Sequence, residues 1–112
     1  MSRHDDSVYL GHMLDNARLI MERTRGVTRE QFDQDIDLKF ALTHIIQILG
    51  EAADKISNST RTAHSGIPWR DIIGMRHRIV HDYMRIDEDR IWKTSTEDVP
   101  ILEAQLKLIL HE

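Results

Sequence analysis

The sequence contains no cysteine, so it can form neither a disulfide framework nor a thiolate metal site. It also lacks any apolar run near the roughly 18 residues that a membrane-spanning helix needs. The first residues, Met1 to Asp6, do not contain the hydrophobic segment of a secretory signal. We therefore expect a cytoplasmic protein, and a length of 112 residues predicts a single domain over residues 1–112.

An overall excess of basic charge is also missing. The net charge of −4 argues against a broadly basic nucleic-acid-binding protein. The charge is unevenly distributed, however, because the window from Arg61 to Arg85 holds five arginines and only two acids. This window favours a local anion-binding face on an acidic body, and the alternative is an ordinary solvated helix face.

Helix-start and helix-stop signals divide the first half of the chain. A first helix is expected from an N-cap among Asp5, Asp6 and Ser7 to about Arg25, with Gly26 as the stop. Thr28 and Gln31 fit a capping box, which opens a long apolar helix to about Ser57. The sequence also allows a break near Gln34-Asp35 that divides this second helix. Its expected apolar positions include Phe32, Ile36, Phe40, Leu42, Ile45, Ile46, Leu49, Ala52, Ala53 and Ile56.

The second half begins with a polar stretch, Ser57 to Gly66, that has no periodicity and predicts a loop. Pro68 suits the first position of the next helix. Asp87 is expected to cap a short helix through Trp92, and the segment 96–100 to start a last helix that carries Ile101, Leu102, Leu106, Ile109 and Leu110. Without an alternating strand pattern or an internal repeat, the chain is predicted to be an all-α bundle of four or five helices.

The segment from Gly74 to Asp87 concentrates arginine, histidine and tyrosine on one expected helix. Arg76 falls within the apolar stripe of this helix, where an unpaired guanidinium would be costly to desolvate. His81 projects about 140° away from Arg76 on a helical count. Either the helix breaks locally, or a second copy of the chain supplies the other half of a shared site.

Arginine and histidine together suffice for metal-free cleavage of RNA. The 2′-hydroxyl attacks the neighbouring phosphorus, His81 moves a proton, and Arg76 stabilises the crowded phosphorane. The alternative interpretation is structural. In that case Arg76 pairs with a carboxylate of the long helix, for which Glu51 is the candidate, and His81 is a surface residue.

The pattern Arg76-x4-His81-x-Tyr83 resembles the Arg-x4-His-x-Tyr signature of the HEPN superfamily, specifically the HepT-like toxins. Further segments resemble this family in the right order, including Ile48 to Ala53 and Pro68 to Ile72. The resemblance extends from about Tyr9 to Leu110. One departure is His77, where many relatives carry asparagine.

The resemblance implies a dimeric, bundle-fold endoribonuclease that acts as the toxin of a type VII-like toxin–antitoxin pair. Arg76 and His81 would be catalytic and would meet in a cleft between two chains. His77, Arg78 and Arg85 would help to hold the RNA phosphates.

The resemblance also implies a second role within the motif. Tyr83 would be the residue to which an MntA-like nucleotidyltransferase antitoxin adds AMP, and the added phosphate would block RNA near Arg76. The alternative for Tyr83 is a core aromatic residue with its hydroxyl at the rim.

Other interpretations carry less weight. His77 and His81 are four residues apart and could hold a metal ion, but no carboxylate or cysteine at recognisable spacing completes a site, so we predict neither metal nor cofactor. Trp69 and Trp92 could stack on bases, yet their positions favour the core. A rival function is a non-catalytic nucleotide- or substrate-binding subunit of the nucleotidyltransferase.

Overall fold

All regular secondary structure in the described part of the chain is helical, without a strand in those residues. The computed structural model describes residues 5–79 and 87–111, with the side chains of residues 76–79 excepted. In chain order its elements are α1 (Asp6–Thr24), α2 (Arg29–Asp33), α3 (Ile36–Asp54), α4 (Asn58–Ala63), α5 (Trp69–Ile79), α6 (Glu88–Lys93), the π-helical turn η1 (Thr94–Asp98) and α7 (Val99–Leu110).

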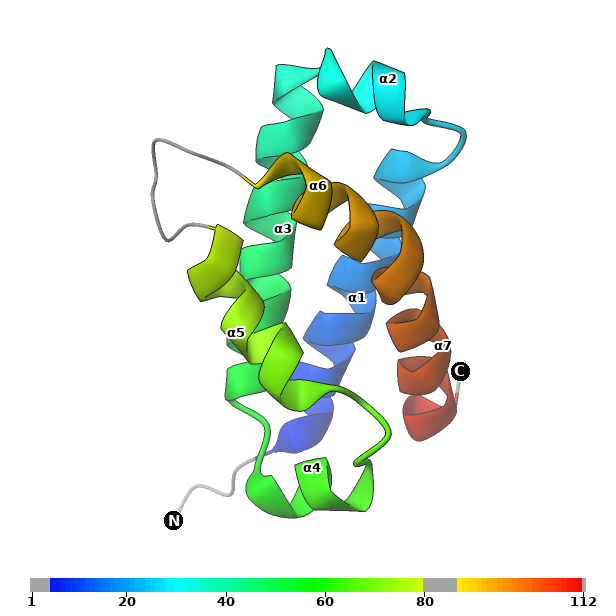
Figure 1. Ribbon diagram of the computed structural model, residues 1–112. Helices are drawn as coiled ribbons and strands as arrows, with labels where there is room; N and C mark the ends of the chain where they lie inside the picture. The colour runs from blue at the N-terminus through cyan, green and yellow to red at the C-terminus, as the bar shows by residue number, and fades with distance from the viewer. Residues whose placement is uncertain (1–4, 80–86, 112) are drawn as a thin grey trace.

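Helix α3 lies next to α1 in the bundle (Figure 1). It packs against α1 and against α5, while α7 packs mainly on α1. The short helices α2 and α6 lie together near the start of α3. The predicted all-α bundle is confirmed, and its core contains Met13, Leu14, Ala17, Ile20, Phe32, Leu42, Ile46, Leu49, Ala53, Ile91, Leu102 and Leu106.

The capping signals in the first half of the chain are confirmed. The Asp5 carboxylate accepts a hydrogen bond from the backbone N–H of Ser7 at the start of α1. Gly26 adopts a φ of 70°, in the left-handed region that favours glycine, just after that helix ends. Thr28 and Gln31 form the expected capping box, and Asp35 caps α3 after the expected break.

The loop predicted between Ser57 and Gly66 is wrong in part, because Asn58–Ala63 forms α4. Ser57 caps this helix by accepting a hydrogen bond from the backbone N–H of Thr60. The Asp6 carboxylate accepts hydrogen bonds from the Ser57 N–H at 3.0 Å and from the hydroxyls of Ser57 and Thr60. Polar contacts of this kind leave no hydrophobic period in the sequence, so a search for apolar spacing misses the helix.

Residues 88–110 form one continuous helical run. Asp87 caps α6 as predicted, accepting from the Arg90 N–H. The expected break before the last helix is absent, because η1 leads from α6 into α7 without a loop. The helix that carries the motif begins at Trp69, one residue after Pro68, whose carbonyl accepts from the Ile72 N–H at 3.0 Å.

Three residues expected on buried faces are exposed instead: Ile36 at 62%, Phe40 at 54% and Ile101 at 63%. Both tryptophans have the expected structural roles. Trp69 is buried and its indole N–H donates to the His64 carbonyl at 3.0 Å, while the Trp92 ring lies 5.0 Å from that of Phe32. None of the helices in residues 5–79 and 87–111 is long and apolar enough to cross a membrane.

Candidate functional site

Helix α5 carries the first part of the motif. Its described backbone runs through Arg76, His77 and Arg78 to Ile79, whereas the side chains of these residues lie outside the described part of the structure. His81, Tyr83 and Arg85 belong to residues 80–86, which also lie outside it. The roles assigned to these six positions therefore stay predictions.

The element that follows the motif is anchored to the start of the bundle. The Lys39 ammonium on α3 donates to the Glu88 carboxylate on α6 at 2.9 Å. The Arg29 guanidinium on α2 contacts Asp33 at 2.7 Å and Asp89 at 2.6 Å. Hydrogen bonds to Asp33 and then to Asp89 raise the pKa of Arg29 above its ordinary value. Residue 87 and α6 thus have a defined position relative to α2 and α3.

Glu51, the candidate partner of Arg76, lies near the end of α3 and is exposed. Among the residues whose side chains the structure describes, it forms no ion pair. Its pairing with Arg76 stays a prediction.

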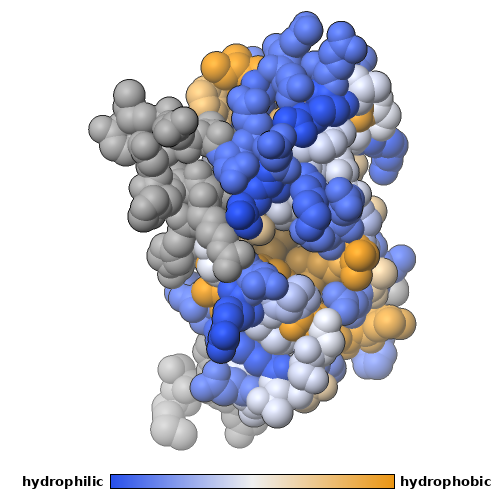
Figure 2. Space-filling view, viewed as in Figure 1, coloured by the Kyte–Doolittle hydropathy of each residue, from blue (hydrophilic) through white to orange (hydrophobic). Residues whose placement is uncertain are grey.

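A pocket of about 280 Å³ lies between α3, α5 and the run from η1 into α7. Figure 2 shows an apolar hollow in the middle of this face, bounded above and below by hydrophilic side chains. Ile46 and Leu49 line it from α3, Ile72 and Met75 from α5, and Leu102 from α7. The pocket exists because α5 packs mainly on α3 and α7 mainly on α1, which leaves α3 uncovered between them.

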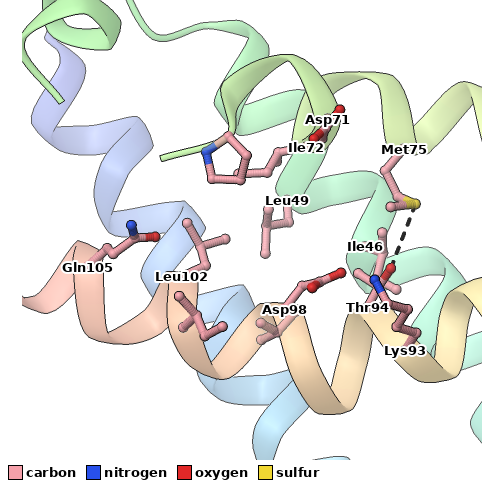
Figure 3. Close-up of a pocket in the computed structure, with 13 residues that line it drawn as sticks. Ile46, Leu49, Asp71, Ile72, Met75, Lys93, Thr94, Asp98, Leu102 and Gln105 are labelled. Atoms are coloured by element: carbon pink, nitrogen blue, oxygen red, sulfur yellow. Dashed lines mark hydrogen bonds between the residues drawn. The ribbon is translucent and has the colours of Figure 1, made fainter. Parts of the chain in front are cut away.

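Five polar side chains line the pocket, namely those of Asp71, Lys93, Thr94, Asp98 and Gln105 (Figure 3). The Asp98 carboxylate and the Lys93 ammonium point toward its middle, whereas the Asp71 carboxylate points away. Gln105 lies at the opposite end, where its Nε2 donates to the Gly66 carbonyl at 3.0 Å. The Gln105 Oε1 is shielded from solvent and has no hydrogen-bond partner among the described residues.

Met75 connects this pocket with the motif helix. Its side chain is 9% exposed, and its sulfur accepts a weak hydrogen bond from the Thr94 hydroxyl at 3.9 Å. The next residue along α5 is Arg76. The pocket therefore lies directly beside the turn of α5 on which the motif begins.

The sequence did not indicate this pocket. Its lining comes from three elements that are far apart in the chain, and Asp98 and Lys93 look in the sequence like ordinary helix-end charges. No group of three or more metal-ligating side chains occurs in the described ranges.

A helical bundle with a pocket beside the helix on which the Arg-x4-His motif begins defines the class, and comparison with known proteins gives the family. Residues 13–109 match the family "Ribonuclease HepT-like", and the chain belongs to this family. The earlier resemblance to HepT-like proteins is thereby confirmed.

Relatives with assigned names agree with this membership. The chain is 36% identical over 104 residues to "Putative RNase TTE0752" of Caldanaerobacter subterraneus subsp. tengcongensis, covering 93% of each chain. It is 35% identical over 99 residues to "Probable ribonuclease HepT" of Thermococcus cleftensis, covering 88% of this chain and 90% of that one. "Putative RNase MJ1380" of Methanocaldococcus jannaschii is 28% identical over 109 residues, 97% of this chain and 100% of that one. No solved structure gives a significant match.

Because Met75 lines the open pocket, we expect its truncation to reduce stability less than truncation of a core methionine. Met75→Ala is expected to lower the free energy of unfolding by about 2 kcal/mol, because one side of the side chain already faces open space. Met13→Ala is the matched control, since Met13 is fully buried in the core, and should cost about 4 kcal/mol. Urea unfolding followed by circular dichroism measures both. An equal cost at the two sites would contradict the open pocket.

Proposed function

We propose that this protein is a metal-independent endoribonuclease, acting as the toxin of a toxin–antitoxin pair. Membership of the Ribonuclease HepT-like family over residues 13–109 is the observation that carries the proposal. That stretch includes the whole Arg76-x4-His81-x-Tyr83 motif. The position of the motif helix beside an open pocket gives a nucleic-acid strand room next to it.

The proposed chemistry is an internal transesterification. The ribose 2′-oxygen forms a bond to the adjacent phosphorus, and the bond from phosphorus to the 5′-oxygen of the next nucleotide breaks. His81 moves the proton from the attacking hydroxyl or to the leaving oxygen, and the products are a 2′,3′-cyclic phosphate and a 5′-hydroxyl. Arg76 binds the phosphoryl oxygens and stabilises the charge that develops on them.

We place this reaction at the junction of two copies of the chain. Arg76 and His81 diverge by about 140° on a regular helix, so two copies can combine Arg76 of one with His81 of the other. Ile36 and Phe40 support this assembly, because they form an exposed apolar pair four residues apart on α3, the helix on which α5 packs.

Control of the toxin is assigned to Tyr83. A nucleotidyltransferase antitoxin would join the Tyr83 oxygen to the α-phosphorus of ATP, with release of pyrophosphate and the phenolic proton. The new phosphodiester adds bulk and negative charge close to Arg76 in the sequence, and this charge would repel an RNA phosphate.

Arg76→Ala and His81→Ala are each expected to abolish RNA cleavage, because each removes one of the two groups that act on the phosphate. Cleavage of a labelled RNA by purified protein is the measurement. Arg70→Ala, an exposed arginine on the same helix, is the matched control and should retain activity. If the wild-type protein cleaves no RNA, the non-catalytic binding subunit becomes the better account; activity retained in Arg76→Ala would contradict the role of Arg76.

Phe40→Asp is expected to shift the protein from dimer to monomer, because it places a charge in the apolar contact between the copies. Multi-angle light scattering measures the mass. Val8→Asp is the control, since Val8 is an exposed apolar residue on α1 and should leave the dimer intact. A dimer that survives Phe40→Asp, or no dimer in the wild type, would refute this interface.

Co-expression with an MntA-like nucleotidyltransferase is expected to add AMP to Tyr83. Intact-mass and peptide mass spectrometry detect the addition, and Tyr83→Phe should remove it. Tyr9→Phe is the control, because Tyr9 is the other tyrosine and lies partly buried on α1. AMP on a different residue would rule out this mode of control.

A further inference from the structure

We infer that the pocket between α3, α5 and α7 is a binding site for one guanine base of the RNA. This inference rests on the proposed ribonuclease function and names the feature of the substrate that the protein reads. Guanine is the base whose shape and hydrogen-bonding edge fit the side chains that line the pocket.

The size and the walls of the pocket fit a planar ring. Drug-sized ligands occupy sites of about 300–1,000 Å³, so a volume of about 280 Å³ suits a single base and little more. Ile72 and Met75 on α5 face Leu102 on α7 across the floor formed by α3. Apolar side chains on opposite walls pack against the two faces of a base, and methionine sulfur makes favourable contacts with aromatic rings.

The polar groups distinguish guanine from the other bases. The two oxygens of the Asp98 carboxylate can accept from two parallel donors, which guanine provides at N1 and at its 2-amino group. The Lys93 ammonium can donate to the adjacent O6. Adenine and cytosine place an unprotonated ring nitrogen beside their amino group, and uracil places two carbonyls around a single N–H, so each would turn a lone pair toward the carboxylate.

The same charges argue against other occupants. Among the side chains that the structure describes, neither Asp98 nor Lys93 forms an ion pair, so both remain available to a ligand. An apolar side chain from another protein would cover them without hydrogen bonds, at a cost in desolvation. A lone phosphate would meet the Asp98 carboxylate and an apolar floor.

The pocket also lies where a base next to the scissile phosphate would be held. Met75 lines it, and consecutive Cα atoms are about 3.8 Å apart, so the backbone of Arg76 begins at the pocket wall. A guanosine seated there would bring its own phosphate to the motif turn of α5. We therefore expect cleavage beside guanosine.

Calorimetric titration of the wild-type protein with guanosine 5′-monophosphate tests the site without any cleavage, because this nucleotide has no phosphodiester to cut. Inosine monophosphate, which lacks only the 2-amino group, should bind about tenfold more weakly. Adenosine and uridine monophosphates should bind more weakly still. Methyl shift changes at Met75 and Leu102 in NMR spectra should locate the guanine nucleotide in the pocket.

Asp98→Asn should remove the preference for guanine over inosine and weaken guanine binding about tenfold or more. Glu97→Gln is the matched control, because Glu97 is an exposed acid next to Asp98 that does not line the pocket. Lys93→Gln is a second test variant should Asp98→Asn fold poorly, and it should weaken guanine and inosine binding alike, since both bases present O6.

The outcomes separate this inference from the proposed function. RNA cleavage without any preference for guanine nucleotides, or with equal binding of all four, would overturn the pocket assignment and leave the ribonuclease in place. Selective guanine binding without cleavage of any RNA would support the pocket and refute the ribonuclease. A change in dimer mass in Asp98→Asn, with guanine binding unchanged, would assign the pocket to a second copy instead.

Discussion

The burial of α3 is the constraint on which the rest of the structure depends. This helix is apolar around much of its circumference, so it is stable only when neighbours cover it. α1 covers one side and α5 another, and the start of α3 is covered by α2 and α6. The position of α5, on which the motif begins, therefore follows from its packing on α3.

The same packing leaves the pocket open. α7 is held by α1, α5 is held by α3, and the surface of α3 between them is covered only at its edges. A site formed in this way has an apolar floor from the core and polar groups from helix ends, a combination common in small-molecule sites. The fold thus provides a hollow beside the motif without any loop being devoted to it.

Much of the fold could be predicted from the sequence because its signals are local. The capping box at Thr28, the glycine stop at Gly26 and the cap at Asp87 each act within a few residues, and all three are present. The short helix α4 could not be predicted from hydrophobic spacing, since contacts with Asp6, about fifty residues away, help to hold it. Ile36 and Phe40 have core-like side chains, but both are exposed near the start of α3.

The candidate site could also be predicted only in part, because the sequence shows the motif but not the pocket. The motif residues lie close together in the sequence, so they can be identified from the sequence alone. The family match covers the same residues. The pocket joins α3, α5 and α7, and only the folded chain shows that Asp98 and Lys93 lie opposite Met75. The geometry between Arg76, His81 and Tyr83 lies outside the described residues and stays a prediction.

The π-helical turn η1 determines which face of the following helix, α7, points toward the core. Buried residues on this run recur at Ile91, Ser95 and Val99, a spacing of four that an ordinary α-helix would let drift around its axis. The wider turn absorbs the drift and keeps Leu102 and Leu106 facing inward. Loss of a single residue here would rotate α7 by about 100° relative to α6, and both the core contact and the pocket wall would be lost together. The length of this turn is therefore as restricted as the identity of any core side chain.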